Sequence, residues 1–374
     1  TLGPPLGGYI IDTFSWPYIF YINIPLGIIA TLLTLQFVRS PKYTEKSKTS
    51  DIDWLGIALL TIFVGSLQFV LEKGHDEDWF DSSLIIIFTI TASLGAFFFV
   101  WRELTYRNPV VNLRVLKNGN LRTGTILSFI LGFGLYGSTF IIPLYTQATL
   151  GWTATQAGLL MIPATLTTAV LMPVIGKMLQ AGVKHQLMAA SGMFVFFIFC
   201  MWGYKILTPD TGEDSFFWML IWRGVAMALL FIPITTLSLS TLKGKQIGEG
   251  ASFTGMMRQL GGSFGIAIIT TFMAKQLIVH RADLASKLDV NNAIVQTRVA
   301  GMQQALIAKG DAPKKKKKKA YKLLDLSVLK QASVMSYMDV FYYIGLMFLI
   351  CVPFVLLIRG KLNNSEKPDL SSLH

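Results

Sequence analysis

The feature that most constrains the fold of this chain is a series of apolar stretches, each about as long as a membrane helix. A helix needs about 20 predominantly apolar residues to cross the hydrocarbon core of a bilayer. Nine stretches reach that length, and a tenth at the beginning of the chain is partial. The predicted spans cover residues 1–9 (partial), 18–38, 53–73, 83–102, 123–147, 155–177, 187–206, 216–241, 251–275 and 338–359.

The composition supports the membrane class. Only 14% of the residues are charged, whereas soluble domains carry about 25%, and the mean hydropathy is +0.53. In lipid each backbone polar group must be satisfied within the protein, which an α-helix achieves by itself. We therefore expect an all-α polytopic membrane protein embedded in a lipid bilayer.

The connecting loops alternate between basic and non-basic. Short loops rich in lysine and arginine stay on the cytoplasmic side of a membrane. The pattern predicts that the basic loops and the C-terminal tail are cytoplasmic and that the partial first helix runs outward. Lysine or arginine occurs in loops 39–52, 103–122, 178–186 and 242–250 and in the tail 360–374, but not in loops 10–17, 74–82, 148–154 and 207–215.

One connection, residues 276–337, is much longer than the others and lies outside the membrane by this count. Apolar residues between Arg281 and Ala308 recur at near-helical spacing, "GDAP" at 310–313 is a turn signal, and 319–336 is again helical in pattern. We expect a helical hairpin. The lysine run Lys314–Lys319 fits a solvated turn, and contact with anionic headgroups or a partner protein is the other interpretation.

The charge and the reactive residues argue against several function classes. The net charge of +12 lies in this run and in short loops, without the basic face and exposed aromatics of a nucleic-acid binder. Cys200 and Cys351 lie in apolar stretches and are expected to be packing residues, and the four histidines lack metal-ligand spacing. No cluster of histidine and carboxylates suits an enzyme, and no repeated polar stripe suits a channel, so we expect neither a metal site nor a catalytic residue.

The opening segment, "GPPLGG" at 3–8, places glycine and proline inside an apolar span. Glycine and proline weaken a helix, so within lipid they are tolerated only where neighbouring groups compensate for the weakened backbone. Gly3, Pro4, Gly7 and Gly8 predict a bent helix with a small-residue face that another helix approaches closely. A generic kinked packing helix is the plainer interpretation. The next segment, "WPYIFYINIPLG" at 16–27, carries Asn23, Pro25 and Gly27.

Together these two segments resemble spans five and six of the EmrB/QacA family, the fourteen-span drug:proton antiporters of the major facilitator superfamily. There G-P-x-x-G-G ends span five and W-R-W-I-F-x-I-N-x-P-x-G opens span six. This sequence departs at Pro17, where the family usually has arginine, and at Tyr18, where it often has tryptophan. Further segments resemble the family in order, the first being like the EmrB branch: 71–80, 142–163, 223–233, 250–268 and 331–341.

The resemblance implies a major facilitator fold that lacks the first four spans and the start of the fifth. It assigns 1–38 to a remnant of the N-terminal bundle and 39–122 to a cytoplasmic loop, two extra central spans and the following loop. It assigns 123–359 to the C-terminal six-helix bundle, with the extracytoplasmic hairpin 276–337 inside it, and 360–374 to a cytoplasmic tail.

Two arginines, Arg223 and Arg258, lie within predicted spans, each roughly 10 Å from the nearer membrane surface. A charge at this depth costs at least a few kcal/mol unless it is paired or hydrated. Each side chain either reaches the nearer interface or faces the central cavity and locks two helices, and the matching family motifs favour the second. Met161, Met193, Phe194 and Phe231 are weaker candidates for the wall of an apolar cavity.

Asn23, Gln147 and Gln259 are neutral polar groups in or near spans, and helix–helix hydrogen bonds are favoured over substrate contacts for them. Gly261, Gly262 and Gly265 form a close-packing face beside Arg258 and are expected to let helices slide or rock. No carboxylate lies inside a span: Glu72, Glu103 and Asp339 are at span ends and Asp12 is just outside. We therefore find no proton-carrying carboxylate in this chain.

The resemblance implies a transporter that exports hydrophobic or amphipathic drugs in exchange for protons by alternating access. It needs no cofactor beyond the proton motive force. It also implies a bacterial inner membrane and, as partners, a periplasmic membrane-fusion adaptor and an outer-membrane channel. Two alternatives stay open: a major facilitator exporter of a defined metabolite or siderophore, and a truncated remnant that does not transport.

Overall fold

The computed structural model describes residues 3–37, 53–106, 109–288, 293–308 and 316–357, and in these ranges the regular structure is helical throughout. Nine helical segments of this part of the chain are long and apolar enough to cross a membrane. The prediction of an all-α polytopic membrane protein is therefore confirmed. The segments are Tyr18–Phe37, Trp54–Lys73, Ser83–Thr105, Gly119–Ala148, Ala154–Gln180, His185–Ile206, Glu213–Leu239, Gln246–Ser286 and Lys318–Leu357.

Proline divides two segments that we predicted as uninterrupted. The first consists of α2 (Tyr18–Tyr21) and α3 (Asn23–Phe37), and the second of α7 (Ala154–Leu160) and α8 (Ile162–Gln180). Pro25 and Pro163 lie just after the two breaks. Because proline has no backbone N–H, neither residue can donate the hydrogen bond that would continue the preceding turn.

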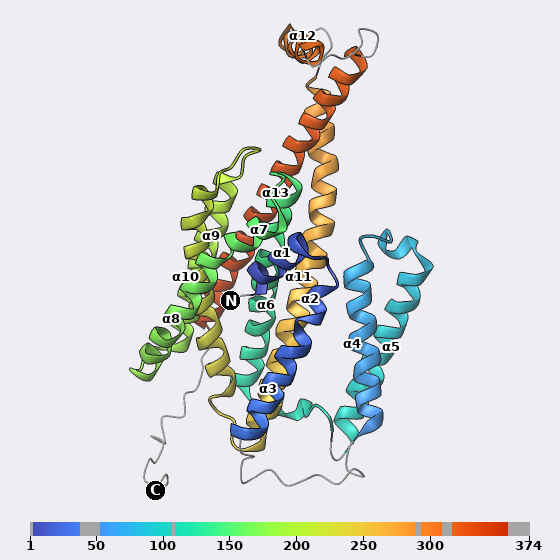
Figure 1. The fold of residues 1–374 in the computed structure, drawn as a ribbon. Helices are drawn as coiled ribbons and strands as arrows, with labels where there is room; N and C mark the ends of the chain where they lie inside the picture. Colours follow the sequence, from blue (N-terminus) through green and yellow to red (C-terminus); the bar gives the residue numbers. More distant parts are fainter. Residues whose placement is uncertain (1–2, 38–52, 107–108, 289–292, 309–315, 358–374) are drawn as a thin grey trace.

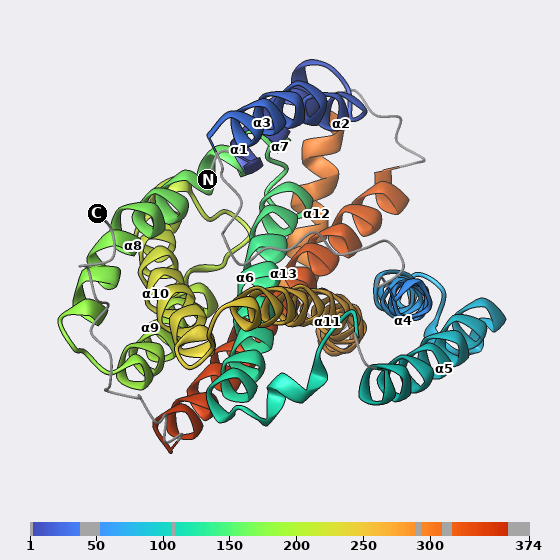
Figure 2. The same cartoon turned by 90° about the horizontal axis from the view of Figure 1, so that it is seen from below.

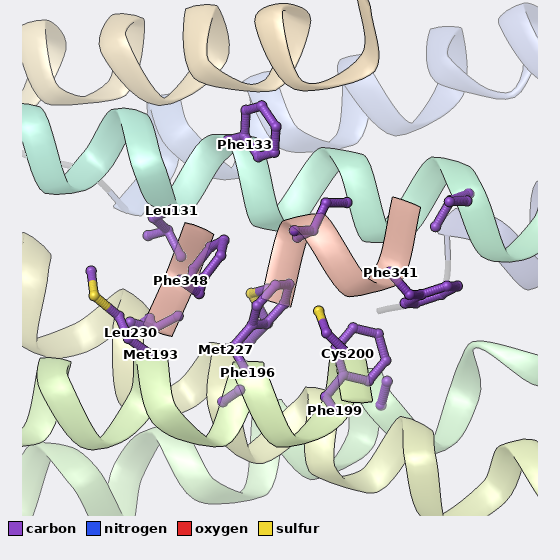
Figure 3. Packing of buried hydrophobic residues seen from close by; sticks show 14 of the residues in the cluster. Leu131, Phe133, Met193, Phe196, Phe199, Cys200, Met227, Leu230, Phe341 and Phe348 are labelled. Carbon is purple, nitrogen blue, oxygen red and sulfur yellow. The ribbon is translucent and has the colours of Figure 1, made fainter. Parts of the chain in front are cut away.

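The largest assembly is a bundle around α6 (Gly119–Ala148), α9 (His185–Ile206), α10 (Glu213–Leu239), α11 (Lys245–Ser286) and α13 (Lys316–Leu357), with α8 packed on α10 (Figure 1). Its core is apolar and aromatic (Figure 3). The ring centroids of Phe196 and Phe348 are 4.2 Å apart, and Cys200 is buried among these side chains. Both cysteines are free, as expected for packing residues.

A separate helical pair, α4 (Trp54–Lys73) and α5 (Ser83–Thr105), stands beside the bundle. Figure 2 shows the pair next to α11 and away from α8, α9 and α10. Within the pair, Phe69 stacks on Phe88 with a centroid distance of 4.3 Å. Its polar link to the bundle is the hydroxyl of Ser263, which donates to Oε1 of Gln68 at 2.7 Å. Among the described residues, α4 of the pair packs on α11, and the short helix η3 (Leu113–Lys117) contacts both α5 and α6.

Helices α11 and α13 are each 42 residues long. At 1.5 Å per residue they measure about 63 Å, roughly twice the hydrocarbon thickness of a bilayer. Figure 1 shows both rising well above the other helices, with α12 (Ala293–Ala308) at their tip. The predicted helical stretch 319–336, which we expected to lead into the last span, forms one helix with that span, and α11 likewise continues beyond its predicted span.

The predicted helical stretch from Arg281 to Ala308 is not one helix, because α11 ends at Ser286 and α12 begins at Ala293. The intervening sequence contains Asp289, Asn291 and Asn292, residue types that compete with helix hydrogen bonds. Val299 of α12 packs with Ala320 and Leu324 of α13. Loop 39–52, residues 310–313, Lys314, Lys315 and the tail 360–374 lie outside the described residues.

Candidate functional site

The opening motif lies in α1 (Gly3–Thr13), which packs closely against α7. A side chain at Gly8 would run into the carbonyl group of Ala154, and one at Gly158 would run into that of Pro4. Glycine on both helices therefore lets the two backbones touch. Near the C-terminal end of α1, Oδ2 of Asp12 accepts a hydrogen bond from the backbone amide of Thr155 at 2.7 Å.

The carboxylate of Asp12 serves as a partner for the N-terminus of α7. Its pKa is lowered because the side chain and the backbone amide of Thr155 both donate hydrogen bonds to it, which outweighs the opposing effect of burial. A negative charge there is also favoured by the unpaired amides at a helix N-terminus. From the sequence we predicted only that Asp12 lies just outside the span, with no role.

The other motif residues have fewer contacts in the described part of the chain. Side chains added at Gly3, Gly7 or Gly27 would meet nothing within 4 Å. Asn23 donates to the carbonyl of Ile19 in its own segment at 3.2 Å, which is not the helix–helix bond that we predicted. Pro25 lies in the exposed helix α3, where it follows the break between α2 and α3.

Arg223 of α10 is 5% exposed and reaches across to α6. Its Nε donates to Oγ of Ser138 at 2.9 Å, and its Nη2 donates to the carbonyl oxygen of Leu135 at 3.4 Å and to Oγ1 of Thr139. The side chain thus joins two helices instead of reaching the membrane surface. All three acceptors are neutral, and no carboxylate of the described residues pairs with it.

A cavity of about 280 Å³ opens beside this arginine. Its walls come from α1, α6, α8 and α10, together with Met161 at the α7–α8 break. Pro4 of the opening motif is part of the wall, so the α1–α7 contact and the buried arginine border one space. Of the four apolar residues proposed for a cavity wall, Met161 and Phe231 line it, whereas Met193 is in the core and Phe194 is exposed.

Arg258 of α11 is half-buried, and its guanidinium carbon lies 4.6 Å from the ring centre of Phe231. This is a cation–π distance. Phe231 also lines the cavity, so Arg258 contacts one residue of the cavity wall without lining the cavity itself. Gln259, the next residue, accepts from the hydroxyl of Tyr136 on α6 at 2.9 Å, which is a helix–helix bond of the kind we predicted.

The glycine face of α11 lies against α6. A side chain at Gly261 would meet the backbone of Phe129, one at Gly262 the ring of Tyr136, and one at Gly265 the backbone of Phe133. Gly132 of α6 faces the backbone of Arg258 in the same way. The two helices therefore cross at backbone contact, on the side of α11 that also carries Gln259. Gln147 is exposed, with no hydrogen bond among the described residues.

The carboxylates at span ends have distinct surroundings. Asp339 accepts from Gln276 and pairs with His280, both at 2.7 Å, which ties α13 to α11. Glu72 accepts from Gln68 at 2.6 Å. Glu103 is fully buried at the end of α5, where one carboxylate oxygen accepts from the amide of Val111 and the other has no partner in the described structure.

A second buried acid, Asp53, precedes α4 and caps it by accepting from the amide of Gly56 at 3.0 Å. Burial alone would raise its pKa, but the hydrogen bonds from Arg102 and from Gly56 outweigh it, so the pKa is lowered. The Nη2 of Arg102 lies 3.1 Å from Oδ1 of Asp53. No group of three or more potential metal ligands gathers anywhere in the described ranges.

Sequence reasoning missed the residues that complete these contacts: Ser138 and Thr139 with Arg223, Gln68 with Ser263, and Arg102 with Asp53. Serine and threonine are common in membrane helices and often bond to their own backbone, so nothing in their spacing marks them. The one available signal was charge, since a buried arginine requires acceptors on a neighbouring helix.

Comparison with known proteins identifies the family. Residues 1–266 match the family model of the Major Facilitator Superfamily. The chain is 33% identical to the multidrug export protein EmrB of Escherichia coli K12, over 80% of this chain and 58% of EmrB. It is 30% identical to the fatty acid resistance protein FarB of Neisseria gonorrhoeae, over 96% of this chain and 68% of FarB. A third relative is the probable multidrug resistance protein EmrY of Escherichia coli K12, at 32% over 78% of this chain and 56% of EmrY.

The chain thus spans somewhat more than half the length of EmrB and EmrY and about two thirds of FarB. The match to the family model, over residues 1–266, includes the α1–α7 contact, the cavity and the α6–α11 crossing. The predicted resemblance is confirmed. The chain belongs to the Major Facilitator Superfamily, a family of transporters, and within it to the EmrB branch.

Proposed function

We propose that the protein containing this chain exports hydrophobic or amphipathic compounds across a bacterial inner membrane in exchange for protons. The observation that carries the proposal is the cavity beside Arg223. It is lined mainly by apolar side chains with a few polar groups, as sites for amphipathic ligands are. It also lies against α1, so motion of the N-terminal remnant relative to the bundle changes its wall.

Alternating access supplies the mechanism for a fold of this kind, because two helical units rock about a site between them. The small-residue contacts suit such motion: Gly8 against Ala154 on one side and Gly261 against Phe129 on the other bring backbones together without interlocking side chains. We assign residues 1–38 to the N-terminal unit, 39–122 to the central pair with its loops, and 123–359 to the C-terminal unit.

The relatives' names support the substrate class, since two of them are named for multidrug export or resistance and one for fatty acid resistance. Proton coupling is proposed from the family. In the described spans the carboxylates occur only near helix ends or in the extensions beyond the membrane, so the cavity itself offers arginine but no acidic proton carrier. The protein acts as a transporter without a bound cofactor or catalytic residue.

We further propose that the C-terminal tail is cytoplasmic and that the hairpin of α11, α12 and α13 is periplasmic. An arm of this length extends far enough to contact a membrane-fusion adaptor, through which an outer-membrane channel would be reached. Co-purification of the adaptor with the intact protein, but not with a variant whose hairpin is shortened, would support this role. Equal recovery of the adaptor with both proteins would contradict it.

The transport proposal is tested in proteoliposomes that contain the intact protein. An imposed proton gradient should drive accumulation of a fluorescent amphipathic dye, and a protonophore should abolish it. Liposomes with the protein but no gradient are the control. Dye movement that is independent of the gradient would contradict proton exchange, and no movement of any amphiphile would contradict the export function.

A further inference from the structure

The guanidinium of Arg223 is a buried cation that lacks a counter-charge in the described structure. Removing a charge from water is unfavourable unless an opposite charge or enough hydrogen bonds replace the lost hydration. Arg223 is only 5% exposed. Its hydrogen bonds all go to one helix, α6, where Ser138, Leu135 and Thr139 accept them. These bonds use Nε and Nη2, whereas Nη1 donates to no acceptor in the described residues.

In the described structure no group of the cavity wall accepts a hydrogen bond from Nη1. Thr165 and Thr168, which line the cavity, direct their hydroxyl hydrogens to backbone carbonyls: Thr168 to those of Ala164 at 2.8 Å and Gly224 at 3.0 Å. The remaining wall is mostly aliphatic, sulfur-bearing or aromatic, and no aspartate or glutamate belongs to it. The cavity is therefore apolar with one cationic donor at its edge.

A ligand that suits such a cavity has an apolar body and an anionic head. The free Nη1 can donate a charge-assisted hydrogen bond to a carboxylate oxygen, and in surroundings without water that interaction is stronger than at a surface. A cationic ligand would instead meet a like charge. We propose that Arg223 binds the acidic head group of amphipathic substrates, so that the cavity selects carboxylate-bearing amphiphiles over neutral and cationic ones. This inference deepens the proposed export function and rests on it.

The ligand pair octanoate and octanamide tests the inference, since the two differ in charge and hardly in size. Binding is measured by calorimetry on the intact protein in nanodiscs, with empty nanodiscs subtracted. Because bonds to a charged acceptor are stronger than bonds to a neutral one, the wild type should bind octanoate about tenfold more tightly than octanamide. Arg223→Gln should bind both with equal affinity and keep the wild-type affinity for octanamide.

Two further variants separate recognition from structure. Arg223→Lys keeps the charge but not the planar fork, so part of the preference for octanoate should remain. Arg281→Gln removes an exposed arginine of the hairpin, one that pairs with Asp325, and should leave both affinities unchanged. If Arg223→Gln fails to fold, the wild-type preference and the lysine variant decide the question.

Two results would overturn the inference. A wild type without preference for octanoate means that another part of the protein already neutralises Arg223. If Arg223→Gln loses affinity for both ligands equally, the arginine serves only to join α10 to α6. Dye transport in proteoliposomes is measured in parallel: transport that persists in either case leaves the export function standing, whereas a wild type that moves no amphiphile refutes export.

Discussion

Replacing Gly8 with alanine should loosen the contact between α1 and α7. The added carbon would lie 2.7 Å from the carbonyl carbon of Ala154 and 3.0 Å from the Cα of Thr155. Carbon atoms in contact normally lie about 3.5–4.0 Å apart. Both neighbours are backbone atoms that cannot rotate away, so α1 must move outward by roughly 1 Å. Overpacking of this kind costs about 1–3 kcal/mol, of which alanine's better helix propensity recovers up to about 1 kcal/mol.

The neighbouring Gly7 provides the matched control. An alanine carbon there meets nothing within 4 Å, so Gly7→Ala should gain the helix propensity without the clash. The two substitutions are chemically identical and one residue apart, yet their effects on the free energy of unfolding should have opposite signs. Unfolding of the intact protein in mixed micelles with increasing dodecyl sulfate, followed by tryptophan fluorescence, measures both. Equal effects of the two variants would refute the close contact at Gly8.

Three other perturbations follow from the same contacts. Asp12→Asn should lower the free energy of unfolding at neutral pH. Because the pKa of Asp12 is lowered in the folded state, the difference in this free energy between variant and wild type should vanish as the pH falls through and below the ordinary carboxyl range. A difference that persists in acid would contradict this role of Asp12. Arg102→Gln should destabilise the central pair, since it leaves Asp53 buried without its ion pair, and adding Asp53→Asn should restore part of the loss; additive losses would argue against the pair. Gly261→Ala should slow substrate transport because the added carbon pushes α11 away from α6. Gly255→Ala should not slow it, because a carbon added at Gly255 meets nothing within 4 Å. Similar transport rates for the two variants would show that this crossing is not tight during transport.

Much of the fold could be predicted from hydropathy and loop charge. The central pair and the helices of the bundle appear where apolar stretches reach membrane length. Predictions failed where the signal was only local. Pro25 and Pro163 divide segments that read as continuous apolar runs, and α11 and α13 extend far beyond their apolar portions, because helix formation outside the membrane depends on packing between the two arms.

The candidate site was predictable in part. Arg223 could be singled out because a charge is rare inside a span, and Gly8 because glycine in lipid needs a close neighbour. The residues that contact Arg223 and Gly8 could not be predicted from the sequence. Ser138 lies 85 residues from Arg223 along the chain, and Asn23, which looked equally suited to a helix–helix bond, bonds within its own segment.

The sequence by itself determined which segments cross the membrane and the order in which they do so. That information is local, because each helix satisfies its own backbone hydrogen bonds and lipid excludes any other arrangement of a long apolar stretch. The tertiary structure alone decided which sides of the helices face one another. The spans are apolar on nearly all sides, so no periodic pattern marks the inward face. Only the packing of α10 on α6 and of α1 on α7 brings a buried arginine and Pro4 of the opening motif to the border of one cavity.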